Sequence, residues 1–134
     1  MKEMTIEASS ENADAVIGFI NGELDAHGCG YDEKMSINVA VDEIFANIAH
    51  YAYGESGDVT VRISFADEPL TAEMSFADSG VPFDPIAAVE PDTALPIEER
   101  EIGGMGIHIV KNSMDSVSYE YRNGKNILTI TKKL

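Results

Sequence analysis

The chain of 134 residues has the length of one domain, and its 44% hydrophobic content is enough for a buried core. Its formal net charge of -15 argues against nucleic-acid binding, because phosphate contacts need clustered Lys and Arg. A single cysteine excludes an internal disulfide, and no apolar run approaches the roughly 18 residues of a membrane-spanning helix. We therefore expect one cytoplasmic domain over residues 1–134, without a membrane or nucleic-acid partner.

The first elements in chain order are a strand and a helix. A short strand is expected over residues 4–8, followed by a helix that Ser9 or Ser10 caps and that runs to about His27. The glycines at positions 28 and 30 end this helix. Its apolar residues share one stripe: Val16, Ile17, Ile20 and Leu24.

A second helix is expected from a cap at Asp32 to about Ala52. One face carries the apolar residues Ile37, Val41, Ile44, Ile48 and Tyr51. Further apolar residues lie on the other side: Met35, Val39 and Ala46. This wide apolar circumference is typical of a helix packed between other elements.

Alternating apolar residues predict a hairpin, with strands at 59–65 and 70–76 around a turn at 67–69. Residues 79–102 follow without a clear period, and loops of this length are usually functional. A third helix begins at the glycines of 103–106, and a second hairpin turns at Asn123-Gly124. This order predicts a two-layer α/β (α+β) sandwich, with a mainly antiparallel sheet and helices on one face.

Two polar groups are candidates for chemistry before the long loop. Glu43 and Asn47 are four residues apart on the second helix, so that they are neighbours and offer a proton acceptor and a Mg²⁺ ligand. Asp78 continues the inward register of the apolar strand before it, and Gly80 allows close approach to the backbone. The alternatives are a solvated helix flank for Glu43 and Asn47, and a turn-capping role for Asp78.

A third candidate is Gly103-Gly104-Met105-Gly106, at the start of the third helix. Exposed backbone N–H groups and a helix N-terminus together form a phosphate site. The motif is neither a P-loop nor a complete Rossmann fingerprint, and a plain turn is the alternative. Residues 102–134 hold 5 basic and 2 acidic side chains, whereas residues 1–101 hold 22 acidic and 4 basic ones. An anion is therefore more favourably bound near the C-terminal segment.

The order of these motifs resembles the N, G1 and G2 boxes of GHKL ATPases, and in particular their anti-sigma-factor serine/threonine kinase branch. The motifs that carry the resemblance are Glu43-x-x-x-Asn47, Asp78-x-Gly80-x-Pro82-Phe83-Asp84-Pro85 and Gly103-Gly104-x-Gly106-Ile107. The resemblance extends from about residue 12 to residue 134 and implies helices over one face of a mixed sheet. Autophosphorylating histidine kinases need a separate helical pair that bears a phosphoacceptor histidine, so we do not expect that activity.

The resemblance also implies an adenine nucleotide and the residues that bind it. Asp78 is expected to accept a hydrogen bond from the adenine amino group, with Gly80 beneath the base and Thr129 as a further adenine contact. Gly104 and Gly106 are expected to present N–H groups to the phosphates.

The same resemblance implies the catalytic groups. Asn47 is expected to ligate Mg²⁺, and Glu43 to act as the base that deprotonates the attacking hydroxyl. Residues 85–102 are expected to form an ATP lid, from which Arg100 reaches the terminal phosphate.

Three functional readings follow. The first is an ATP- and Mg²⁺-dependent serine/threonine protein kinase that phosphorylates an anti-sigma factor antagonist, a small STAS-type domain, or sequesters a sigma factor. The second is a nucleotide-dependent partner-binding module without kinase activity. The third is a nucleotide-binding domain that hydrolyses ATP slowly and has no protein substrate. The resemblance suggests a homodimer.

Overall fold

The computed structural model describes residues 1–49, 57–82 and 102–134, with only the backbone of residues 10 and 102–107. The elements in chain order are β1 (Lys2–Glu7), the 3-10 turn η1 (Ser10–Asn12), α1 (Ala13–Ala26), α2 (Tyr31–Asn47), β2 (Asp58–Ala66), β3 (Thr71–Asp78), α3 (Ile102–Ser113), β4 (Ser116–Arg122) and β5 (Lys125–Lys133). None of the helices in these ranges is long and apolar enough to cross a membrane.

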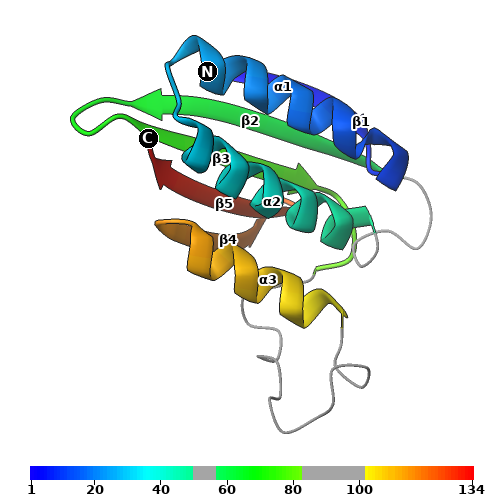
Figure 1. The fold of residues 1–134 in the computed structure, drawn as a ribbon. Coiled ribbons are helices and arrows are strands. Elements are labelled where there is room, and N and C mark those ends of the chain that lie inside the picture. Colours follow the sequence, from blue (N-terminus) through cyan, green and yellow to red (C-terminus); the bar gives the residue numbers. More distant parts are fainter. Residues whose placement is uncertain (50–56, 83–101) are drawn as a thin grey trace, which may run out of the picture.

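The five strands form one sheet in the order β1-β2-β3-β5-β4. Figure 1 shows the three helices over one face of this sheet, with α2 between α1 and α3. The predicted two-layer architecture is confirmed. Every strand pair in the described part of the chain is antiparallel, so the sheet there is not mixed as the family resemblance implied.

The core lies between the helices and the sheet. It is formed by apolar residues that alternate along the strands and recur at helical spacing along the helices. The inward side chains of β2 and β3 alternate with outward ones, as a pleated strand requires. The helix residues that meet them recur at helical spacing. The largest fully buried side chains include Phe45, Phe76, Ile20, Leu24, Ile37, Ile44, Ile63, Met74 and Ile130.

The two predicted helix caps are wrong. Residues Ser10–Asn12 form the 3-10 turn η1, so α1 begins at Ala13 and neither Ser9 nor Ser10 is its N-cap. The helix α2 begins at Tyr31 with Gly30 at its N-cap position, which puts Asp32 inside the first turn. An acidic residue there still favours the helix, because it faces the positive end of the helix dipole.

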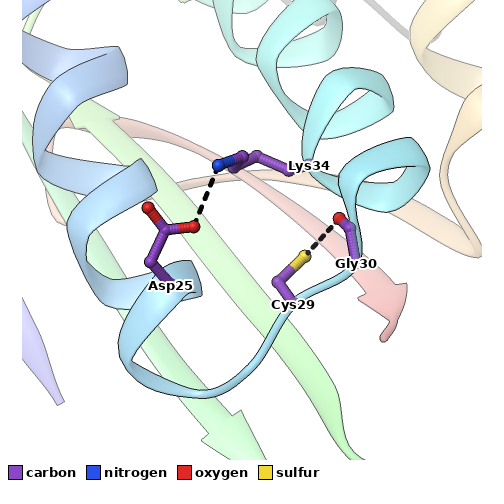
Figure 2. A network of polar contacts seen from close by, with 4 residues as sticks. All are labelled: Asp25, Cys29, Gly30 and Lys34. Atoms are coloured by element: carbon purple, nitrogen blue, oxygen red, sulfur yellow. Dashed lines mark hydrogen bonds and ion pairs between the residues drawn. The ribbon is translucent and has the colours of Figure 1, made fainter.

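A short turn connects α1 to α2 and is held by two polar contacts (Figure 2). Lys34 at the start of α2 pairs with Asp25 at the end of α1, with 3.0 Å between Nζ and Oδ1. The Cys29 thiol donates to the Gly30 carbonyl at 3.4 Å. Gly28 has a φ of 75°, a left-handed conformation that favours glycine at this helix end.

The C-terminal hairpin is held against the end of α3. Asn123 and Gly124 both have positive φ, as the tight turn predicted for this pair requires. The ammonium group of Lys132 donates to the Ser113 carbonyl at 2.8 Å, where the helix ends. A cation at that position is favourable, because it neutralises the negative end of the helix dipole.

Candidate functional site

Three elements end in the same region of the domain. Figure 1 shows the C-terminal ends of α2 and β3, together with the N-terminal end of α3, at one end of the molecule. The three motifs singled out in the sequence are located on these elements: Glu43 and Asn47 on α2, Asp78 on β3, and the glycines on α3. The fold therefore gathers segments that are far apart in the sequence.

Asp78 is the last residue of β3 and is only 3% exposed. It shares the helix-covered face of the sheet with buried Met74 and Phe76, so the predicted inward register is confirmed. Its Oδ1 accepts hydrogen bonds from the Gly80 N–H at 2.9 Å and from Asn126 Nδ2 at 3.0 Å. Within the described residues no hydrogen bond reaches Oδ2, so one oxygen of a buried carboxylate can still accept a donor.

The Gly80 contact also shows that the turn-capping alternative describes part of the role of Asp78. A carboxylate removed from water is costly unless donors satisfy it. Two donors on Oδ1 reduce that cost.

Thr129 does not lie where an adenine contact requires. It pairs with Ser75 on β3 and Ser118 on β4, and it faces the side of the sheet opposite Asp78. The expectation for Thr129 is therefore wrong, because side chains alternate along a strand and Asp78 faces the helices.

The residue of β5 that does reach Asp78 is Asn126, which is 5% exposed and which sequence reasoning missed. Its Nδ2 also donates to the carbonyls of Gly80 at 3.4 Å and Val81 at 3.0 Å, and its Oδ1 accepts from the Tyr119 hydroxyl. In the sequence, the alternation that includes Leu128 and Ile130 indicates which face of β5 it occupies, but not which strand lies opposite.

Glu43 and Asn47 lie one turn apart near the C-terminal end of α2, and both side chains are half-buried. Buried Ala40 and Ile44 flank them on the core side. The roles of Glu43 as a base and of Asn47 as a metal ligand stay predictions. The α-helix ends at Asn47, and Ile48–Ala49 continue it as a wider turn.

The glycine motif lies in the first turns of α3, which begins at Ile102. The predicted helix start is confirmed. Gly104 is the third residue of α3, where backbone N–H groups have no partner inside a helix. Gly106 is the fifth, and its N–H points along the helix towards the carbonyl one turn before, so we keep Gly104 alone as a backbone ligand. Arg100 and residues 85–101 of the expected lid lie outside the described residues.

Metal binding can be judged from the ligand sets that the described residues offer. Across the described residues 1–49, 57–82 and 108–134, no three His, Cys, Asp or Glu residues cluster as a metal site would. Mg²⁺ commonly takes one or two protein oxygens and completes its shell with phosphates and water. Asn47 as a Mg²⁺ ligand stays a prediction.

Comparison with known proteins identifies similar domains over almost the whole chain. Residues 6–132 match the family model described as the histidine kinase-like ATPase domain. The serine-protein kinase RsbW of Halalkalibacterium halodurans is 32% identical, over 98% of this chain and 82% of that protein. The serine/threonine-protein kinase BtrW of Bordetella bronchiseptica is 26% identical, over 73% of this chain and 69% of that protein.

A solved structure, the Acinetobacter baumannii histidine kinase AdeS, has a TM-score of 0.49 and 13% identity to this chain, covering 99% of this chain and 68% of that one. This similarity is too low to add to the family match. The family model and the two kinases confirm the GHKL resemblance and its serine/threonine kinase branch. The chain belongs to the histidine kinase-like ATPase domain family.

Proposed function

We propose that the chain is an ATP-binding regulatory serine/threonine protein kinase of the anti-sigma-factor type. Its substrate would be a serine or threonine of a small STAS-type antagonist domain, and a sigma factor would be a second partner. The observation that carries the proposal is Asp78, a buried carboxylate at the end of β3, whose hydrogen bonds to Gly80 and Asn126 both go to Oδ1. This end of β3 lies at the same end of the molecule as the C-terminal end of α2 and the N-terminal end of α3 (Figure 1). The kinase names of the relatives support the reaction type.

In this proposal Asp78 selects the nucleotide by its base. The 6-amino group of adenine donates to Oδ2, while Gly80 leaves room for the base above the backbone. The phosphates lie towards the N-terminal end of α3, where the N–H of Gly104 and the helix dipole favour an anion. The side-chain oxygen of Asn47 would hold Mg²⁺, which would neutralise charge on the phosphate oxygens.

Phosphoryl transfer then needs a proton acceptor near the terminal phosphate. The oxygen of the substrate hydroxyl forms a bond to the γ-phosphorus as the bond to the bridging oxygen breaks, and ADP leaves with that electron pair. Glu43 takes the hydroxyl proton. Arg100 stabilises the charge on the transferred group.

The acidic balance of residues 1–101, with 22 acidic and 4 basic side chains, supports a partner with a basic docking surface. We expect that such a complex weakens as salt rises, because charges on the surface are screened over about 8 Å at physiological ionic strength. A homodimer is part of the proposal, and light scattering on the purified protein tests it separately from the enzymatic activity.

Two measurements test the function. Calorimetry with MgATP and MgADP tests nucleotide binding, and single-turnover transfer from γ-labelled ATP to candidate antagonist domains tests the kinase. Binding with transfer supports the proposal. Binding without transfer to any candidate favours the partner-binding module, and absence of nucleotide binding contradicts both functions.

A further inference from the structure

The helix α2 has a second apolar side, which the fold leaves open. Its core side, which includes Ile37 and Ile44, is buried over the sheet, where Figure 1 shows α2 between α1 and α3. On the other side Tyr31, Met35 and Val39 are 72%, 36% and 49% exposed. The described elements therefore leave uncovered one side of a helix whose sequence predicts packing around most of its circumference.

These three exposed residues follow one another at intervals of four, so they form a single ridge along the helix surface, the α2 ridge. Isolated exposed apolar side chains are normal on a protein surface. Among the described residues, however, the other large exposed apolar side chains lie one to an element or outside the elements, and only α2 carries three in a row. A continuous apolar ridge is typical of a surface that another helix covers.

The charges around the α2 ridge indicate what kind of surface can cover it. Asp32 and Asp42 are exposed, and helical geometry puts them on either side of the ridge. Three acidic side chains on α1 and four on α2 compare with one basic side chain, Lys34. The ammonium group of Lys34 is paired with Asp25 on α1, with 3.0 Å between Nζ and Oδ1 (Figure 2). The helices that carry and flank the ridge are therefore strongly acidic.

This charge argues against two possible occupants of the ridge. A second copy packed ridge to ridge would bring Asp32 and Asp42 of both chains into one contact, and like charges close together are destabilising. An anionic lipid surface would be repelled by the same carboxylates. A protein surface with apolar side chains at its centre and Lys or Arg at its rim matches both the ridge and its charges.

We propose that the α2 ridge is a docking surface for an amphipathic helix of a partner protein, whose apolar stripe is flanked by Lys and Arg. Such a helix fits because its own apolar residues, three and four apart, pack into the grooves beside a four-residue ridge. Val39 precedes Asn47 by eight residues, which is about 12 Å along the helix axis. A partner on the ridge therefore lies beside the candidate site without filling it. The inference rests on the partner binding in the proposed function, and adds the surface and the shape of the partner.

The probe that tests this surface is a synthetic peptide of Leu and Lys, about 18 residues or five helical turns long, whose leucines form one stripe. One control peptide has the same composition in scrambled order, and the other has Glu in place of Lys. Nuclear magnetic resonance of the isotope-labelled protein gives the Kd and the residues whose amide signals shift. We expect the striped Leu–Lys peptide to shift signals of residues 31–42 and to bind at least about 5-fold more tightly than the scrambled peptide. The Glu peptide should not bind.

Tyr31→Gln, Met35→Gln and Val39→Gln remove apolar surface from the ridge, and glutamine is a good helix former, so the fold should be kept. Each variant should weaken binding of the striped peptide about 3- to 10-fold, because part of an apolar side chain is no longer buried in the contact. Asp42→Asn should weaken it about 2-fold and reduce its salt dependence. Tyr121→Gln is the matched control, since Tyr121 is an exposed apolar side chain on β4, and it should bind as the parent does.

Three results would overturn the docking surface. They are signals that shift on the open face of the sheet instead of on α2, equal affinity for the striped and scrambled peptides, and equal weakening by Tyr121→Gln and the ridge variants. Light scattering tests the second copy, and a change of oligomeric state in Met35→Gln would also overturn the proposal. The peptide titration needs no nucleotide, so the two proposals fail separately. A parent that transfers phosphate but does not bind the peptide contradicts the docking surface alone, and one that binds the peptide but no nucleotide contradicts the kinase function alone.

Discussion

Replacing Asp78 by asparagine isolates the group that carries the proposed function. The variant keeps the shape of the side chain, and its amide oxygen can still accept from the Gly80 N–H and Asn126 Nδ2. The second carboxylate oxygen becomes an NH₂ group, which is a donor. Fold contacts are thereby kept, while the acceptor proposed for adenine is removed.

The expected magnitude follows from burial and charge. Asp78 is 3% exposed, so water cannot readily replace the lost acceptor. A hydrogen bond to a charged, buried group contributes about 1–3 kcal/mol, which corresponds to roughly a 5- to 150-fold weaker Kd for MgADP. The unfolding free energy should change much less, because both bonds to Oδ1 have a counterpart in the variant.

The assay is calorimetric titration with MgADP, with a urea unfolding curve for each variant. Glu73→Gln is the matched control, because it removes one negative charge from the same strand at an exposed position. It should bind ADP as the parent does. If Asp78→Asn binds ADP with the affinity of the parent while remaining folded, Asp78 does not read the base and the reasoning from its burial is refuted.

Three further predictions concern catalysis, stability and the thiol. Glu43→Gln should bind MgATP at least as well as the parent but transfer phosphate about 10²- to 10⁴-fold more slowly in single-turnover assays. The neighbouring Asp42→Asn is the control and should transfer phosphate at the parental rate. A parental rate in Glu43→Gln would rule out Glu43 as the base. Lys132→Met removes the hydrogen bond to the Ser113 carbonyl, so it should lower the unfolding free energy measured in urea by about 1–2 kcal/mol. The control Lys133→Met should have little effect. Equal losses of stability in the two variants would contradict a stabilising role for the Lys132 bond. Burial, and after it the Glu33 carboxylate, raises the pKa of the Cys29 thiol. Because the thiolate is the reactive form, alkylation of Cys29 should stay slow up to a higher pH in the folded chain than in the unfolded chain, and Glu33→Gln should accelerate it. Equal alkylation rates in the folded and unfolded chain would contradict the raised pKa.

The regular elements followed from local patterns. The alternation through Val59, Val61 and Ile63 and the helical stripe of Val16, Ile20 and Leu24 each have a buried side to match. Burial of apolar surface acts on every residue of such a stripe at once, so the signal is strong. Helix starts were less predictable, because Ser9, Ser10 and Asp32 can all cap a helix. The residues found at the N-cap positions are Asn12 and Gly30, and they are set by how the chain enters each helix from η1 and from the α1–α2 turn.

The sequence by itself determined the two-layer architecture, the inward register of Asp78 and the helix start at the glycines, because each depends on periodicity or turn chemistry within a short segment. The tertiary structure alone decided which residues meet. The pairing of β3 with β5 crosses over an intervening helix and strand, and it placed Asn126 against Asp78 while turning Thr129 to the opposite face. The alternation of Leu128 and Ile130 with Thr129 already separates the two faces of β5, but it does not say which strand β5 pairs with, so only the β3–β5 pairing put Asn126 opposite Asp78.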